Sequence, residues 1–560
     1  MAISASLLML LLPALLLALV PTFLIEALLR PRPLPVWRRP TACLALHLGV
    51  LLLIFMVELA VFRRPYFAAL SVLGWFGFVV LVSVAKEQVL REPFIYQDFD
   101  YFTDAIRHPR LYLPFLGWAR ALLVVAGLAL AITGGMLAEA PVTVTMPMAP
   151  FIGLLAVLGM AAVSLLWLGS RAVLAPVFRP PEDLVRLGLI GSLWSYAVAE
   201  RRDAGGRQMA PAYGVQVTQA AMAQGAPSPL QMPLPQVQRQ PLPERSVELS
   251  HLVVVQSESF FDARRLCAGI KPAVLSTFDA LGATALQHGR LQVPAWGANT
   301  VRTEFGFLSA LPADSLGVHR FNPYRRLART GVPTLASHLR AQGYRTVCVH
   351  PYIAAFYDRD VVYPMMGFDD FIDIEAFTKV MGQGPYVGDI DVARKVAALL
   401  DVADAQPTGP MFIFVITMEN HGPLHLETMQ AGDVARLYDT APPAGCEDLT
   451  YYLRHLCNAD RMLALLAERL RASQRAGCLC FYGDHVPIMA SVYGVLGEPD
   501  GATEYLLWHS RNELAAARPA TTVGVEDLAG LILDAISGTV CTTNNTLATA
   551  TGNAKAGPPA

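Results

Sequence analysis

The sequence predicts a chain of two parts: an N-terminal polytopic α-helical membrane domain with five spans, and a C-terminal α/β/α sandwich with a mostly parallel sheet. Hydrophobic residues make up 54% of the 560 residues and charged residues only 16%. An ordinary soluble protein has about 25% charged residues. The apolar excess is gathered in the first third of the chain, whereas the second half alternates short apolar runs with helical patterns. That alternation is typical of an α/β domain.

Composition also limits the classes of function. The chain is too apolar for one large cytosolic enzyme and for a disordered or fibrous protein. Its formal net charge is −2 at pH 7. It therefore lacks the excess of positive charge that is typical of nucleic-acid-binding proteins, and we expect no nucleic-acid partner. Eight cysteines in a chain of this length do not make a disulfide scaffold.

Five charge-poor apolar stretches predict the membrane domain. Each is long enough, at about 1.5 Å rise per residue, to cross roughly 30 Å of hydrocarbon. One such stretch alone could be a buried core helix, but five in succession indicate membrane spans. The stretches cover residues 3–29, 42–62, 67–85, 121–138 and 151–170.

The composition changes again after the fifth stretch. Residues 184–198 are apolar but too short for a sixth span, which predicts an interfacial helix at the headgroups. Residues 201–246 are rich in Gln, Pro, Ala and Met, a composition that favours an extended tether. The predicted domains are a membrane domain at 1–179, an interfacial helix and linker at 180–246, an α/β domain at 247–540 and a disordered tail at 541–560.

The second half contains four apolar runs that predict parallel strands buried on both faces. These runs cover residues 252–256, 346–349, 411–417 and 478–482, and the clearest helical patterns lie at 333–342, 391–403 and 451–473. A polar residue closely follows each run, in order Glu258, His350, His421 and Asp484. A lone acid or histidine after a strand is more often a turn residue, but four strand ends at one sheet edge favour a shared site.

The donor types in this cluster suit a divalent cation. Glu258, Asp484 and His485 offer carboxylate oxygen and imidazole nitrogen, a set that fits Mn²⁺ or Zn²⁺, and Mg²⁺ if waters complete its shell. Thr300 and Thr303 supply hydroxyls after a glycine-containing turn and are candidate nucleophiles. Their spacing alone does not choose between them.

Five motifs occur in an order that resembles one family. The motifs are QSES at 256–259, ANTVRTEF at 298–305, FYDRD at 356–360, MENHGP at 418–423 and YGDH at 482–485. They resemble lipoteichoic acid synthases and periplasmic phosphoglycerol transferases, sulfatase-like enzymes of the alkaline phosphatase/sulfatase superfamily. The resemblance covers roughly residues 247–540 and extends to the layout of five spans, a linker and a catalytic domain.

The resemblance implies roles for eight residues. It implies a metal held by Glu258, Thr300, Asp484 and His485, with Thr300 also the nucleophile. It implies that Tyr357, Arg359 and His421 hold the phosphoglycerol group, with His350 near the same pocket. Arg359 would offset charge on the phosphoryl oxygens and His421 would carry a proton. The cofactor is one divalent cation, with Mn²⁺ expected and Mg²⁺ or Zn²⁺ as alternatives.

The implied function is transfer of phosphoglycerol from phosphatidylglycerol to an extracytoplasmic glycan or polymer, through a covalent intermediate on Thr300. Alternatives within the superfamily are a phosphoethanolamine transferase, a phosphodiesterase or a sulfatase. A sulfatase would need a Cys/Ser-x-Pro-x-Arg segment, and the residues around Thr300 do not provide one. A catalytically inactive membrane scaffold is a more distant alternative, because nucleophile and metal ligands are all present.

Basic residues and the resemblance predict opposite orientations. Arginine and lysine follow spans one, three and five, at 30–39, 86–110 and 171–186. By the positive-inside rule these regions, and the catalytic domain with them, would be cytoplasmic. The resembling enzymes act outside the cytoplasmic membrane, where acceptor glycans lie. We therefore expect a multi-pass protein of the bacterial inner membrane with an extracytoplasmic, periplasmic catalytic domain.

Overall fold

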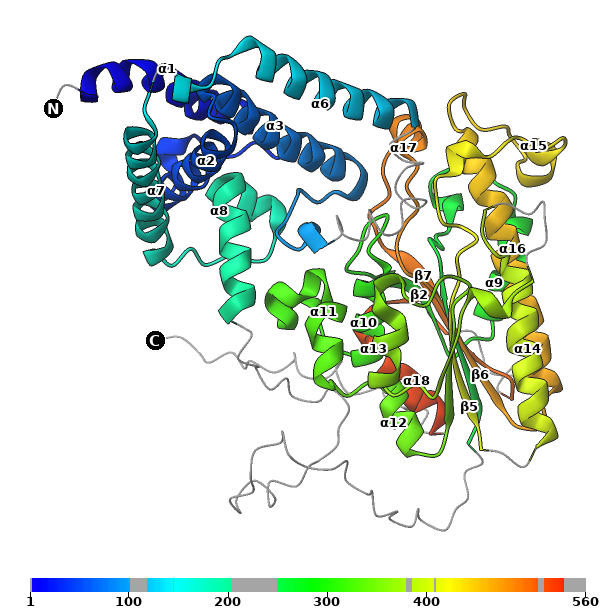
Figure 1. Ribbon diagram of the computed structural model, residues 1–560. Helices are drawn as coiled ribbons and strands as arrows, with labels where there is room; N and C mark the ends of the chain where they lie inside the picture. The colour runs from blue at the N-terminus through cyan, green and yellow to red at the C-terminus, as the bar shows by residue number, and fades with distance from the viewer. Residues whose placement is uncertain are drawn as a thin grey trace, which may run out of the picture.

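The computed structural model of the protein describes residues 3–100, 118–144, 146–202, 249–378, 385–406, 409–511 and 518–537. Apolar helices form the N-terminal part, and an α/β domain lies beside them (Figure 1). Most of the predicted linker, from residue 203 onward, and the predicted tail at 541–560 lie outside the described residues.

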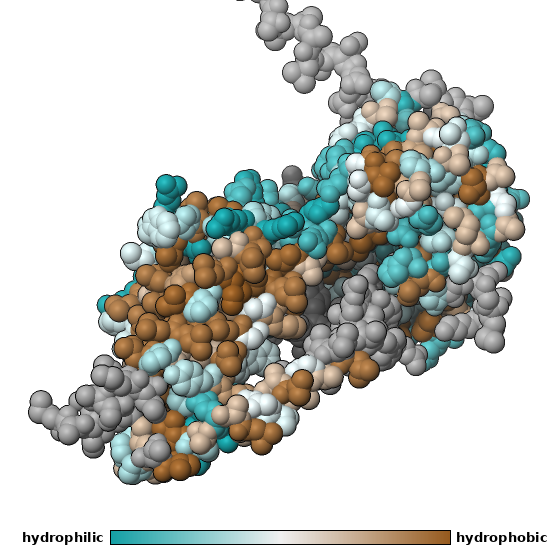
Figure 2. All heavy atoms as spheres, turned by 90° about the horizontal axis from the view of Figure 1, so that it is seen from above, coloured by the Kyte–Doolittle hydropathy of each residue, from teal (hydrophilic) through white to brown (hydrophobic). Residues whose placement is uncertain are grey.

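A helix occupies each of the five predicted membrane stretches. Over the part of the chain that the structure describes, three of them, α2, α3 and α7, are long and apolar enough to cross a membrane. Two further apolar helical segments, Leu11–Glu26 and Ala129–Val144, are shorter. Figure 2 shows apolar side chains gathered over these helices, in contrast to the more polar surface of the α/β domain. The bounds are α1 Ile3–Glu26, α2 Thr41–Phe62, α3 Pro65–Leu90, α6 Trp118–Ala138 and α7 Met148–Arg171.

The predicted interfacial helix is longer than expected and connects the two parts. Helix α8 runs from Pro180 to Arg202 and is kinked at Gly188, whose φ is 72°. The Leu189 N–H beside the kink donates to the buried Glu26 carboxylate (2.8 Å), which also pairs with Arg39 (2.7 Å). Farther along α8, the buried Tyr196 ring stacks on Phe321 of the α/β domain at 5.4 Å between centroids.

An eight-stranded sheet forms the centre of the α/β domain, in the order β4-β3-β5-β1-β6-β7-β2-β8. Pairing is parallel from β4 to β6 and between β2 and β8, and antiparallel between β6 and β7 and between β7 and β2. The mostly parallel sheet is therefore as predicted. The strands are β1 His251–Ser257, β2 Gln287–Gln292, β3 Arg345–Val349, β4 Asp370–Ile372, β5 Met411–Ile416, β6 Gly477–Gly483, β7 Thr503–His509 and β8 Thr521–Gly524.

Helices cover both faces of this sheet (Figure 1). Alternate residues of a strand point to opposite faces, so Val253 and Val255 of β1 pack into one core while Leu252 and Val254 pack into the other. One face carries α9 Ser276–Gly282, α14 Asp389–Ala405 and α16 Glu447–Ala472. The other carries α10 Thr300–Ser309, α12 Leu335–Ala341, α13 Arg359–Met365 and α18 Leu528–Ile536.

Candidate active site

A pocket of about 590 Å³ opens where the carboxyl ends of the central strands meet. It brings together residues that are far apart in the chain, because each follows a different parallel strand or begins a helix at the same edge. Asp484 is fully buried beside this pocket. The other seven predicted site residues line it: Glu258, Thr300, His350, Tyr357, Arg359, His421 and His485.

Three of these residues form a group that could hold a metal ion. One ligand atom from each of Glu258, Asp484 and His485 lies within 4.8 Å of the others, and all three side chains are buried. His485 Nε2 lies 3.3 Å from Asp484 Oδ2 and 3.6 Å from Glu258 Oε1. His485 Nδ1 lies 3.1 Å from the Val486 carbonyl oxygen. A proton on Nδ1 therefore leaves the Nε2 lone pair to the carboxylate side, as a metal-binding imidazole requires.

The electrostatics of this group fit a divalent cation. Asp484 Oδ2 is buried and has no hydrogen-bond partner among the described residues, an arrangement that needs a compensating ligand. Burial and the neighbouring Asp484 carboxylate raise the pKa of Glu258 to about 8. A cation at this position would satisfy the orphaned oxygen and offset the two carboxylates.

Ser259 donates hydrogen bonds to two of the three candidate metal ligands, a role that the sequence analysis did not identify. Its N–H donates to Asp484 Oδ1 (2.8 Å) and its hydroxyl to Glu258 Oε1 (2.9 Å). The backbone of Ser259 is left-handed, with φ of 53°, which is uncommon outside glycine and marks a constrained position. Its place in the QSES motif was the available signal.

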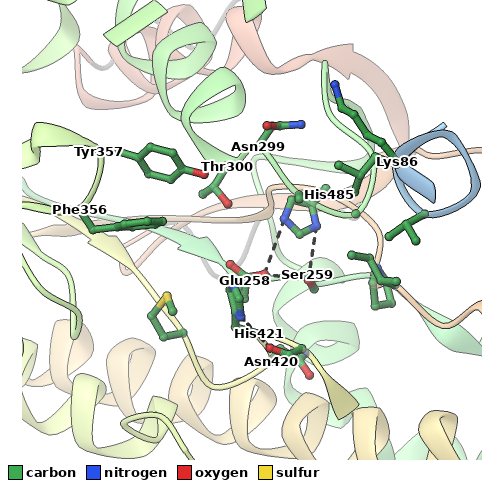
Figure 3. Close-up of a pocket in the computed structure, with 18 of the residues that line it drawn as sticks. Lys86, Glu258, Ser259, Asn299, Thr300, Phe356, Tyr357, Asn420, His421 and His485 are labelled. Atoms are coloured by element: carbon green, nitrogen blue, oxygen red, sulfur yellow. Dashed lines mark hydrogen bonds and ion pairs between the residues drawn. The ribbon is translucent and has the colours of Figure 1, made fainter. Parts of the chain in front are cut away.

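The turn before α10 presents Thr300 to the pocket. Asn299 and Gly297 both have left-handed backbones, with φ of 68° and 67°, and a Cβ at position 297 would lie 2.7 Å from Ile488 Cγ1. Glycine is therefore required there. The second candidate hydroxyl, Thr303, is fully buried and donates to the Asp484 carbonyl oxygen at 2.9 Å. Figure 3 shows Thr300 and Tyr357 on one side of the pocket, with Glu258 and His421 facing them.

Arg359 is held by a buried carboxylate that was not among the predicted site residues. Its guanidinium pairs with Glu304, and the two side chains are 2% and 0% exposed. Glu304 also accepts hydrogen bonds from Tyr324 (2.5 Å) and Tyr363 (2.7 Å). Glu304 lies four residues after Thr300 on α10, so the same short helix carries the hydroxyl and the anchor of the arginine.

The two pocket histidines are held in their neutral forms. His350 Nδ1 lies 3.2 Å from the Ile416 carbonyl oxygen, and Nε2 accepts from Arg359 (3.2 Å). Burial, with the positive charge of Arg359, lowers the pKa of His350 well below its usual value. His421 Nδ1 lies 2.8 Å from the Gly422 carbonyl oxygen, and burial lowers the His421 pKa. These contacts assign the proton to Nδ1 of His421 and leave Nε2 able to accept one.

The Arg359 guanidinium also lies over the Tyr357 ring, 5.2 Å from its centroid. Tyr357 has a left-handed backbone, with φ of 59°, and its ring lines the pocket. Two of the three residues predicted to hold the headgroup, Tyr357 and Arg359, therefore lie in direct contact.

The end of α3 forms another wall of the pocket, which the sequence did not predict. The third span was expected to end at residue 85, yet α3 continues to Leu90, and its last turns line the pocket together with Gly297 and Ile488. Lys86 of this helix also lines it. The signal in the sequence was the lysine directly after an apolar stretch, which was interpreted only as evidence of orientation.

Comparison with known proteins agrees with this architecture. Residues 250–539 match the Sulfatase family model. The chain is 27% identical over 505 residues to the capsular polysaccharide biosynthesis protein RkpI of Rhizobium meliloti (strain 1021), covering 86% of this chain and 84% of that protein. It is 29% identical over 258 residues to a protein of the same strain named provisionally for cyclic beta-1,2-glucan modification, covering 45% of this chain and 38% of the other.

Two solved structures are similar over about half of the chain. One is the Streptococcus pyogenes phosphoglycerol transferase GacH in complex with sn-glycerol-1-phosphate, with 21% identity and a TM-score of 0.41, covering 51% of this chain and 75% of that one. The other is the Listeria monocytogenes lipoteichoic acid synthase LtaP, with 20% identity and a TM-score of 0.40, covering 51% and 72%.

Proposed function

Because the chain belongs to the sulfatase family, we propose that it is a membrane-bound, metal-dependent phosphotransferase. Its donor is phosphatidylglycerol, from which it moves phosphoglycerol to an extracytoplasmic glycan or polymer. One observation carries the proposal: the Thr300 hydroxyl shares a pocket with a buried metal-binding group, and a helix apolar enough to span a membrane forms another wall of that pocket. The FYDRD and MENHGP motifs support phosphoglycerol as the group transferred.

Glu258, Asp484 and His485 are the residues that would hold the cation, with Thr300 as fourth ligand. We propose Mn²⁺, which accepts mixed oxygen and nitrogen ligands, with Mg²⁺ or Zn²⁺ as alternatives. When bound, such an ion lowers the pKa of a coordinated hydroxyl and offsets negative charge on phosphoryl oxygens.

In the first step Thr300 Oγ forms a bond to phosphorus while the bond from phosphorus to the diacylglycerol oxygen breaks. The threonine releases its proton to water, and diacylglycerol takes up a proton from water as it leaves into the bilayer. Thr300 begins α10, where the positive end of the helix favours a developing alkoxide. Arg359, held in place by Glu304, offsets charge on the phosphoryl oxygens.

In the second step an acceptor hydroxyl attacks the phosphoglycerol-threonine intermediate. His421 accepts the proton of that hydroxyl at Nε2, since its Nδ1 is committed to the Gly422 carbonyl oxygen. The bond from phosphorus to Thr300 Oγ then breaks, and the threonine takes up the proton that His421 accepted. The names of the two Rhizobium meliloti relatives, one in capsular polysaccharide biosynthesis and one in glucan modification, support a glycan as the acceptor.

The intact mass of the protein tests the donor and the intermediate together. Incubation with Mn²⁺ and phosphatidylglycerol is expected to add the mass of one phosphoglycerol group. An ethanolamine-phosphate adduct formed from phosphatidylethanolamine would instead indicate a phosphoethanolamine transferase. Rapid release of phosphoglycerol to water in the absence of any acceptor would favour a phosphodiesterase, and no adduct with either lipid would contradict the proposed transfer.

We also propose that the catalytic domain lies outside the inner membrane, against the positive-inside count. Several of the counted basic residues bind carboxylates within the protein: Arg39 pairs with Glu26, and Lys86 with Glu92 and Asp98. Internal pairing therefore gives these basic residues a structural role that does not depend on orientation. Added protease is expected to digest the catalytic domain in spheroplasts, and protection of the domain until lysis would contradict this placement.

A further inference from the structure

We propose that the last two turns of α3 bind the diacylglycerol part of the donor lipid, and that this wall makes the pocket prefer a membrane lipid over a water-soluble phosphodiester. The inference rests on the proposed function, because it names what holds the leaving group of that reaction. It assigns a substrate-binding role to residues of the N-terminal helices, outside the α/β domain that carries the metal-binding group.

The wall is an apolar strip on one face of a helix. Val82, Ala85, Val89 and Leu90 line the pocket, and their spacing of three, four and one residues keeps them on one side of α3. The strip adjoins the turn before Thr300, where a Cβ added to Gly297 would lie 3.5 Å from Leu90 Cδ2. The apolar surface of a candidate membrane span thus continues to within contact distance of the nucleophile turn.

The chemistry of the wall selects the occupant. Phosphoglycerol and a glycan acceptor are polar and gain little from an aliphatic surface, whereas a glyceride backbone and its first acyl carbons bury apolar area against it. The helix that provides the wall is itself one of the three candidate membrane spans. A lipid could therefore keep its acyl chains in the bilayer while its phosphate reaches the metal-binding group.

Ion pairs hold the wall at a fixed position relative to Thr300. Glu92, just after α3, pairs with Lys86 (2.6 Å) and with both terminal nitrogens of Arg302 (2.8 and 3.0 Å). Burial alone would raise the pKa of Glu92, but Arg302 and Lys86 lower it to about 2. Arg302 is on α10, two residues after Thr300. Helix α3 and the helix that begins with Thr300 are thereby linked through one carboxylate that is only 12% exposed.

Lys86 does not offer an alternative anion site on this wall. Its Nζ donates to Glu92 and Asp98, at 2.6 to 2.9 Å, and lies 3.3 Å from the Pro93 carbonyl oxygen. Figure 3 shows the Lys86 nitrogen turned away from Glu258. The positive charge is used to fasten α3, which leaves the apolar strip as the surface that a donor contacts.

The test measures the rate at which phosphoglycerol is added to the full-length protein from each of two donors. One donor is dipalmitoyl phosphatidylglycerol in detergent micelles, and the other is its deacylated form, glycerophosphoglycerol. Ala85→Trp fills the space beside the wall. The ratio compared is the rate of adduct formation from phosphatidylglycerol divided by the rate from glycerophosphoglycerol. Ala85→Trp is expected to lower this ratio by about tenfold, the effect of losing contact with roughly two methylene groups. Val89→Thr, which adds no volume, is expected to lower the ratio in the same direction.

Leu70→Trp is the matched control, because Leu70 lies near the other end of α3 and is 58% exposed; it should leave the ratio unchanged. If Ala85→Trp and Val89→Thr change both rates equally, or neither, the inference is wrong. If the wild type reacts with the lipid alone, Ala85→Trp must slow that reaction and Leu70→Trp must not. A wild type that reacts with neither donor would contradict the proposed function itself.

Discussion

Replacing Thr300 by alanine is expected to abolish the covalent adduct and to lower turnover by at least about 10³-fold, the scale seen when a nucleophile is removed from a preorganised site. Thr300 is the candidate hydroxyl that lines the pocket, and Thr303 cannot replace it because its hydroxyl is bound to the Asp484 carbonyl oxygen. The readouts are intact mass after incubation with phosphatidylglycerol and the rate of diacylglycerol release.

Two variants make this result specific. Thr300→Ser keeps a hydroxyl at the start of α10 and should still form the adduct. Thr303→Ala removes a buried hydrogen bond without removing the nucleophile, so it should keep the adduct while lowering stability by about 1 kcal/mol. Normal turnover in Thr300→Ala, or an adduct mapped to Thr303, would show that the nucleophile has been assigned to the wrong residue.

Replacing Glu304 by glutamine is expected to cause a large loss of stability of the α/β domain. Arg359 would remain almost fully buried without its counter-charge, and breaking one side of a buried ion pair typically costs about 3–5 kcal/mol. Tyr324 and Tyr363 would also lose a charged acceptor. Urea unfolding followed by circular dichroism would measure the change in the free energy of unfolding.

The control for this variant is an ion pair of the same kind at the surface. Asp314 pairs with Arg320 at 2.6 Å, but its side chain is 84% exposed. Asp314→Asn should therefore change stability by less than about 1 kcal/mol. If Glu304→Gln and Asp314→Asn lowered the free energy of unfolding equally, burial of the Glu304–Arg359 pair would not control how much that pair contributes to stability.

The strands that could be predicted are those at the centre of the sheet. β1, β3, β5 and β6 are continuous apolar runs, because neighbours and helices bury both faces of each strand. β2 and β8 are partly exposed and carry polar residues, and β4 has only three residues, so they lack that signal. β7 is buried, but its TEYLLWH sequence begins with polar residues and gives no long apolar run.

The family could also be predicted from the sequence, and the match to the Sulfatase family model confirms the predicted superfamily. Short motifs keep their residue types and order because each residue is needed for one chemical role, whatever the rest of the chain does. The count of five spans is supported for three helices in the described part of the chain. Spacing alone could not decide whether Thr300 or Thr303 is the nucleophile, because both lie on the same short segment.

Local patterns in the chain were sufficient for the apolar N-terminal helices, the central strands and the polar residues at the strand ends, because apolar runs and strand-end chemistry depend on nearby residues. Folding in three dimensions was needed for three features: the wall that α3 contributes, the Glu304 anchor of Arg359, and the hydrogen bond that occupies Thr303. Each is a contact between distant segments, such as Glu92 with Arg302 across 210 positions. Local periodicity carries no record of such pairings, which arise when the apolar faces of separate elements pack together.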